Sequence, residues 1–236
     1  LYAMDAIVNQ AAKWSHMLGG QAHPGVTIRS IINRGGEQGA QHSQALHAWF
    51  AHVPGLRVVM PSTVADARDL LIASVLCNDP VMYIDDRWLY KQEDDLPPVV
   101  ELDLTSQRPV VSILGNDITI VASGHSSLLA REAAKKLQSE DISVEVVDIR
   151  VLNPFHTEKI IESVKKTKNL LVVDSGWLSG GFSAEIIAKV IEQLPVDCLN
   201  NPPVRVALPD APAPTSRILE KAYYTSTNDV VKAVKK

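Results

Sequence analysis

Short runs that are apolar almost throughout recur along this chain, separated by longer segments with helical periodicity. GLRVVMP (55–61), PVMYID (80–85) and NLLVVDSG (169–176) are examples of the apolar runs. A strand without a polar face has to be covered on both sides, which is typical of parallel sheets flanked by helices. The alternation of such strands with helices therefore predicts an α/β fold built on doubly wound parallel sheets.

The alternation stops near residue 85 and resumes near residue 117. The stretch between these points contains three prolines, a cluster of acidic residues and no sustained periodicity. Such composition is typical of a segment that connects two domains, and 236 residues are enough for one or two. The second half contains four predicted strands with intervening helices, which would make a complete small doubly wound domain.

Two helix starts carry capping signals of their own. Thr63 and Asp66 have the spacing of a capping box at the start of a helix predicted over 62–78, and Asn228 is the predicted N-cap of the last helix, 227–236. The other predicted elements are strands at 25–32, 117–124, 142–150 and 204–209 and helices at 3–14, 43–53, 126–141, 157–168 and 182–194.

The composition argues against several classes of partner. The net charge of −4 and the lack of Lys/Arg clusters give no reason to expect nucleic acid or a membrane surface as a partner. No stretch approaches the roughly 20 apolar residues of a membrane span. Cys77 and Cys198 lack metal-ligand spacing and predict reduced thiols in a cytoplasmic protein. The chain starts at Leu1 without a signal-peptide pattern and enters a helix at once, so we expect it to be part of a longer chain.

His42 is the candidate catalytic residue. The glycines at 35, 36 and 39 allow a tight backbone path, and a segment with helical spacing follows. We therefore expect His42 at or just before a helix N-terminus, where the helix dipole favours the neutral imidazole that serves acid–base chemistry. The alternative is a histidine in an ordinary solvent-facing loop. His47 and His52 follow at five-residue intervals, which do not share a helix face, and are interpreted as structural.

Two other stretches have polar features. DSGWLSGGFSAE (174–185) lies between a predicted strand and helix and could hold an anion at the helix N-terminus, but its glycine spacing favours a packing turn. NDP (78–80) ends the predicted helix 62–78. Its orphan carbonyls and the Asp79 carboxylate could hold a hard cation, or the tripeptide could be a plain C-cap.

The stretches GAQHSQALHAWFAHVPGLRVVMPSTVADARDLLIASVLCNDP (39–80) and PVRVALPDAPAPTSRILEKAYY (203–224) together carry a resemblance. They resemble the beta subunit of the thiamin diphosphate-dependent 2-oxo acid dehydrogenases, the decarboxylating components of the pyruvate, branched-chain and acetoin complexes. The resemblance covers essentially the whole chain. It implies the later part of a pyrimidine-binding domain at 1–90, a linker at 91–112, and a transketolase C-terminal-type α/β domain at 113–236.

The resemblance also implies a reaction. A 2-oxo acid would be oxidatively decarboxylated on thiamin diphosphate and its acyl group transferred to a lipoyl group. The cofactor would be shared with an alpha subunit that holds magnesium, in a heterotetramer with a second beta subunit that serves a lipoyl acyltransferase core. The family's motif histidine corresponds to His42, as proton donor and acceptor beside the thiazolium ring. The family's catalytic glutamate lies upstream of Leu1, so the chain is expected to be inactive alone.

A structural monovalent cation such as potassium is a further implication of the resemblance. The matching positions are the carbonyls of Val26, Ser74 and Cys77 and the side chain of Asp79. Asp79 stands where the family usually has Asn, and Cys77 where it usually has Asp. The backbone ligands would survive both changes.

Two alternatives remain open. The chain could be a transketolase-type C-terminal half that acts on sugar phosphates. Such proteins usually carry phosphate-gripping arginines in the second domain, whereas Arg131, Arg150, Arg205 and Arg217 are scattered here. The chain could also be a non-catalytic dimerisation or docking module, with the apolar helix 182–194 as a subunit contact.

Overall fold

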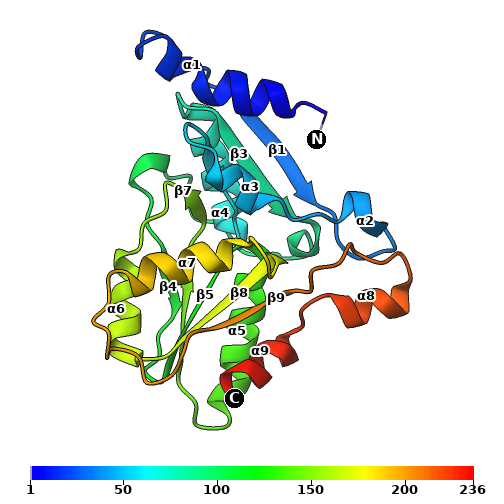
Figure 1. The fold of residues 1–236 in the computed structure, drawn as a ribbon, viewed down its shortest axis with the longest axis vertical. Coiled ribbons are helices and arrows are strands. Elements are labelled where there is room, and N and C mark those ends of the chain that lie inside the picture. Colours follow the sequence, from blue (N-terminus) through cyan, green and yellow to red (C-terminus); the bar gives the residue numbers. More distant parts are fainter. Residues whose placement is uncertain (1) are drawn as a thin grey trace.

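The computed structural model describes residues 2–236 and contains two sheets, which lie one above the other along the long axis of the molecule (Figure 1). The elements of the first half are η1 (Ala6–Ala11, π-helical), α1 (Ala12–Met17), β1 (Thr27–Ile32), α2 (Gly39–His42), α3 (His47–His52), β2 (Arg57–Val59), α4 (Val64–Leu76), β3 (Val81–Asp86) and the single turn η2 (Arg87–Leu89). Among residues 2–236, no helix is long and apolar enough to cross a bilayer.

The elements of the second half follow a short 3-10 turn, η3 (Leu104–Ser106). They are β4 (Val110–Ile113), β5 (Ile118–Ala122), α5 (Gly124–Gln138), β6 (Val144–Asp148), β7 (Val151–Asn153), α6 (Glu158–Thr167), β8 (Leu170–Trp177), α7 (Phe182–Ile191), β9 (Val204–Leu208), α8 (Arg217–Tyr223) and α9 (Thr227–Val234). The sequence patterns located nearly all of these strands and the longer helices, but they did not predict α8 as a helix.

The first sheet has the order β1-β3-β2-β7, in which β1, β3 and β2 are parallel and β7 is antiparallel to β2. The strand predicted over 142–150 differs here from the structure. It ends at Asp148, and the chain turns at Arg150, whose φ is +60°. The following β7 leaves the second sheet and completes the first, because the left-handed turn at Arg150 redirects the backbone.

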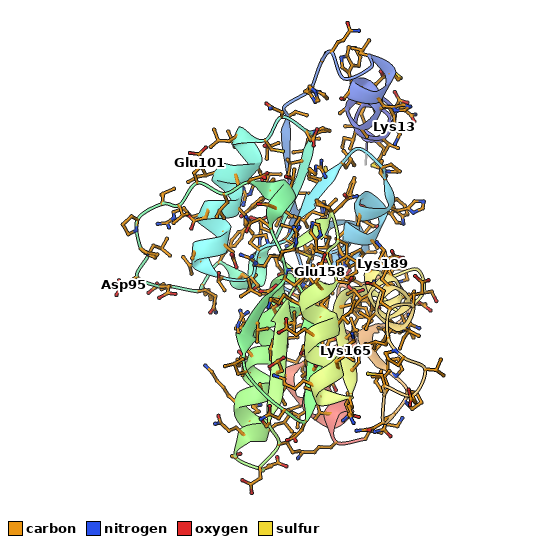
Figure 2. All side chains as sticks on the ribbon, turned by 90° about the vertical axis from the view of Figure 1, so that its left-hand side faces the viewer. Lys13, Asp95, Glu101, Glu158, Lys165 and Lys189 are labelled. Carbon is orange, nitrogen blue, oxygen red and sulfur yellow. The ribbon has the colours of Figure 1, made fainter. Side chains whose placement is uncertain are left out.

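The second sheet has the order β4-β6-β5-β8-β9. Four of its strands are parallel, as the alternating pattern predicts, and β4 joins the edge antiparallel to β6. Residues 110–112, which the sequence placed in the linker, thus belong to a strand. The loop before β4 runs past α4, where Arg68 Nη1 donates to the Pro97 carbonyl at 2.7 Å. Figure 2 shows Asp95 and Glu101 on this outlying loop.

Alternating residues of the second sheet face two different layers. Val121, Val147 and Val172 pack towards α6 and α7, whereas Ile120, Val146 and Leu171 pack towards α5 and α9. The α6–α7 layer is continuous with the core of the first sheet, where Val58, Met60, Met82 and Ile84 belong to the same cluster. The opposite face of the first sheet is covered by α4, through Leu70 and Ala73. The two halves therefore share one apolar core.

One predicted helix start is confirmed in part, and another is wrong. Thr63 caps α4, since its Oγ1 accepts a hydrogen bond from the Asp66 N–H at 3.1 Å. The reciprocal bond of the predicted capping box is replaced by one from the Thr63 hydroxyl to the Asp66 carboxylate at 2.9 Å. The predicted cap Asn228 is wrong. The N-cap of α9 is Ser226, which forms a reciprocal capping box with Asp229. Asn228 is instead the second residue of the helix, and its side chain accepts from Lys136 Nζ at 3.1 Å.

Candidate functional site

The carboxyl edge of the first sheet brings together residues that are far apart in sequence. β1 and β3 are parallel, with Ile32 paired with Asp86, so the segments that follow them emerge side by side. Arg34 follows β1 and Trp88 follows β3 at this edge. In open α/β sheets, ligands bind outside the carboxyl ends of the strands. A ligand is therefore expected at this edge of the sheet.

His42 lies on the segment that leaves this edge, and its side chain is exposed. The predicted position at a helix N-terminus is wrong. His42 is the last residue of the one-turn helix α2, and α3 begins only at His47. Carbonyl groups, not N–H groups, are orphaned at the end of a helix, so the dipole argument for a neutral imidazole does not apply. The accessible ring remains available to a group bound at this edge.

Arg34 anchors the start of this segment. Its side chain is 4% exposed, and Nη2 lies 2.7 Å from Asp86 Oδ2 as an ion pair, although the groups are not aligned for a hydrogen bond. The guanidinium carbon lies 5.5 Å from the centroid of Trp88 and 5.8 Å from that of Tyr224. Tyr224 comes from the far end of the chain, so the second half closes over Arg34.

The middle of the segment contacts α8. The backbone N–H of Glu37 donates to both carboxylate oxygens of Glu220, at 3.1 and 3.2 Å. Gly39 has a φ of +69°, and a Cβ atom there would lie 2.9 Å from Thr215 Oγ1, so a side chain at this position would be strained and would displace Thr215. A cavity of about 610 Å³ opens beside these contacts, between Trp88, His125 and α8.

His125 closes the inner side of that cavity. It is 7% exposed, and its ring packs edge-on against Trp88 with 5.0 Å between centroids. Burial, together with the nearby charge of Arg34, lowers the pKa of His125 to about 3. The imidazole is therefore neutral at physiological pH. Nothing in the local sequence around His125 signalled this environment.

A buried pair joins the two halves at a second place. His47 Nε2 lies 2.8 Å from Asp174 Oδ1, across 127 positions of sequence, and both residues are almost fully buried. Asp174 also accepts from the backbone N–H groups of Gly176 and Ser183, at 2.9 and 2.8 Å. Burial by itself raises the pKa of Asp174, but His47 and these two N–H groups together lower it to about 2.

The contacts of Asp174 show why the glycine-rich stretch 174–185 is a packing turn and not a site for an external anion. The N-terminus of α7, where the sequence allowed an anion, is occupied by the chain's own Asp174 carboxylate. The five-residue spacing favoured a structural role for His47, and His47 does lie buried between the two halves. Its partner Asp174 could not be predicted from that spacing. The stretch is thus a packing turn with an internal anion.

A third polar contact between the halves centres on Asp148. It accepts a hydrogen bond from the Ser62 hydroxyl, and Arg131 Nη1 lies 3.6 Å from its carboxylate. Burial raises the pKa of Asp148 to about 6, because these two partners only partly offset the loss of solvent. Next to it, Arg150 pairs with Asp66 at 2.9 Å. Arg131 and Arg150 are therefore engaged in holding the halves together.

The predicted cation ligands lie near one another at the amino edge of the first sheet. The Val26 carbonyl accepts from the Val81 N–H at 2.8 Å, and the Ser74 carbonyl accepts from Thr27 Oγ1 at 2.8 Å. Cys77 follows as the C-cap of α4. Among residues 2–236, no three His, Cys, Asp or Glu side chains gather closely enough to hold a metal ion. A cation here would therefore depend on backbone oxygens.

Asp79, the predicted side-chain ligand, is engaged elsewhere. Its Oδ2 accepts from Arg57 Nη2 at 2.6 Å and from Nε at 2.9 Å. His23 Nδ1 lies 3.8 Å from the other carboxylate oxygen. A cation that used Asp79 would compete with the Arg57 guanidinium.

Comparison with known proteins identifies two regions of the chain. Residues 2–92 match the family model described as the transketolase pyrimidine binding domain. Residues 109–230 match the transketolase C-terminal domain. A solved structure described as a split gene transketolase, an inactive beta4 tetramer, aligns with a TM-score of 0.73 over 99% of this chain and 72% of that chain. Its sequence identity is 24%, so this likeness concerns the fold.

Curated relatives match along the whole chain. The pyruvate dehydrogenase E1 component subunit beta of Rickettsia felis is 37% identical over 100% of this chain and 72% of its own length. The protein of the same name from Rhizobium meliloti is 36% identical, and this chain spans about half (51%) of its length. The acetoin:2,6-dichlorophenolindophenol oxidoreductase subunit beta of Bacillus subtilis is 34% identical over 96% of this chain and 66% of its own length.

Proposed function

Since this chain belongs to the beta-subunit family of the thiamin diphosphate-dependent 2-oxo acid dehydrogenases, we propose that it serves the decarboxylating component of such a complex. It would act with an alpha subunit and a second beta subunit, as a heterotetramer, and pass an acyl group to the lipoamide of an acyltransferase core. The observation that carries the proposal is the match of this chain, along its whole length, to relatives named as pyruvate dehydrogenase E1 beta subunits. The matches to the transketolase pyrimidine binding and C-terminal domains agree with it.

Thiamin diphosphate, when bound, supplies the carbanion-stabilising chemistry, and protein groups orient the reactants and move protons. Within this chain, we assign the proton transfer to the imidazole of His42. Its exposed ring stands on a segment at the carboxyl edge of the first sheet, where α/β proteins bind ligands. Magnesium and the diphosphate are assigned to the alpha subunit.

A monovalent cation such as potassium is proposed at the carbonyls of Val26, Ser74 and Cys77. Each carbonyl has two lone pairs, so those of Val26 and Ser74 can still accept a cation beside the hydrogen bonds described above. Because Arg57 holds Asp79, the backbone oxygens would supply most of this site. The ion would brace the start of β1 against the end of α4.

The test of the proposed function uses the full-length chain co-expressed with an alpha-type subunit. Decarboxylation of pyruvate and of branched 2-oxo acids is measured together with acyl transfer to lipoamide. We expect His42→Ala to assemble normally and to lose roughly 10²–10⁴-fold in acyl transfer, the usual contribution of a general acid–base group. His16→Ala, which removes an exposed histidine on α1, is the matched control and should retain activity. Full activity of His42→Ala would reject the assigned role.

A further inference from the structure

The segment that carries His42 contains a backbone conformation that needs outside support. We define the His42 loop as residues 33–43. Within it, Gly35, Gly36 and Glu37 have φ values of +73°, +69° and +62°. Glycine adopts such left-handed conformations readily, whereas a residue with a side chain rarely does. A run of this kind that ends on a glutamate persists only where surrounding contacts hold it.

Glu220 on α8 is the contact that holds Glu37. Its carboxylate accepts the Glu37 N–H with both oxygens, at 3.1 and 3.2 Å, across 183 positions of sequence. Glu220 is only 6% exposed. Among residues 2–236, the hydrogen bonds to this carboxylate come from Glu37 alone.

This arrangement is costly as a purely structural device. A buried carboxylate with few partners loses solvation that one N–H group does not restore, and an apolar side chain in its place would often be as stable. The contact is nevertheless directed at the strained residue of the loop. Such strain and partly satisfied charge are typical of sites where geometry serves function.

We propose that Glu220 is a positioning residue: it fixes the His42 loop against α8 and thereby sets where the His42 imidazole stands. The inference rests on the proposed role of His42 and adds to it that the C-terminal part of the chain controls the geometry of the catalytic loop. Arg34 and Asp86 fix the start of the loop, and Glu220 fixes its middle. Glu220 itself does not contact the reacting groups.

The experiment measures two quantities in the same variants: amide hydrogen exchange over residues 35–42 and steady-state kinetics of the chain with its alpha-type subunit. For Glu220→Ala we expect exchange in this segment to rise roughly tenfold or more, because the acceptor is lost. The value of kcat should fall about tenfold or more while KM for the 2-oxo acid stays unchanged, since misplaced groups slow the chemical step.

Glu220→Gln keeps one acceptor oxygen without the charge, so both effects should be smaller, about threefold. This variant also tests the idea if Glu220→Ala does not fold. Lys221→Ala, an exposed neighbour on the same helix, is the matched control and should change neither quantity.

The outcomes separate this inference from the proposed function. If His42→Ala is inactive but the Glu220 variants keep the exchange or the kcat of the unmodified chain, Glu220 does not position the loop, and the proposed function stands. If His42→Ala is fully active, the role assigned to His42 is wrong, and the positioning inference falls with it. If the unmodified chain with its alpha-type subunit shows no 2-oxo acid decarboxylation, the proposed function itself is wrong, whatever exchange shows. The positioning role is supported if exchange rises and kcat falls together, by a small amount in Glu220→Gln and by a larger amount in Glu220→Ala.

Discussion

Two buried aspartates at the contact between the halves have pKa values that are shifted in opposite directions. Asp174 has a charged or hydrogen-bonding partner on each oxygen, so its pKa falls to about 2 in spite of burial. Asp148 has one hydroxyl donor and an arginine at 3.6 Å, and burial raises its pKa to about 6. The number and alignment of donors, not depth, decides which carboxylate stays ionised. Each shift makes folding depend on pH in its own range.

Because of the raised pKa of Asp148, we expect the free energy of unfolding to fall as the pH rises from about 4 to about 6. The folded pKa of about 6 exceeds the reference value of 3.8, so the folded chain binds the extra proton in this range. Its stabilising contribution is fully present below pH 3.8 and is lost as the pH rises through 6, by about 3 kcal/mol in total.

Urea unfolding at a series of pH values measures this slope. Asp148→Asn should flatten the curve in this range, because the amide does not titrate. Ser62→Ala removes a donor to the carboxylate and should shift the loss to higher pH. A curve that is flat between pH 4 and 6 for the unmodified chain would contradict the assignment.

The ends of individual helices and strands are set by local hydrogen bonds and turns. Some of these ends can be predicted from the sequence, and others cannot. The Thr63 cap of α4 follows the expected spacing, because cap and partner are three residues apart. At α9 both Ser226 and Asn228 are acceptable caps by type, and the helix starts at the first, which has Asp229 to complete a capping box. At β6 the strand ends early because Arg150 is left-handed.

The capping box predicts that substitutions at Ser226 and Asn228 lower the free energy of unfolding by different amounts. Ser226→Ala should lower the free energy of unfolding by about 1 kcal/mol, since it removes the acceptor for the Asp229 N–H. Asn228→Ala, which alters a residue inside the helix, should change it by less than about 0.5 kcal/mol. Chemical denaturation of the two variants side by side measures the difference. The reverse order would restore Asn228 as the cap.

At the scale of the whole molecule, the two halves are joined by more than a linker. β7 follows the second-half strand β6 in sequence, yet it completes the first sheet beside β2. One apolar cluster contains Met60 and Ile84 of the first half together with Ile160 and Ile186 of the second. Two buried polar contacts, at Asp148 and Asp174, and the partly buried contact at Glu220 cross the same boundary. The halves are therefore expected to depend on each other for stability.

This shared core predicts one cooperative unfolding transition. Calorimetry of the chain should give a calorimetric enthalpy equal to the van't Hoff enthalpy. Leu152→Ala in β7, a residue 1% exposed in the common cluster, should cost about 2–5 kcal/mol and lower the temperature of the single transition. Two separate transitions, with only one shifted by the variant, would contradict the coupling.

The sequence by itself determined the α/β class, most strands and long helices, the Thr63 cap and the family, and it singled out His42. Each of these depends on residues that are neighbours in sequence or on a contiguous motif. The tertiary structure alone decided that β7 crosses to the first sheet, that His42 ends a helix, that Asp174 meets His47, and that Glu220 holds Glu37. These contacts join residues 127 and 183 positions apart, and no local periodicity records which distant side chains folding will bring together.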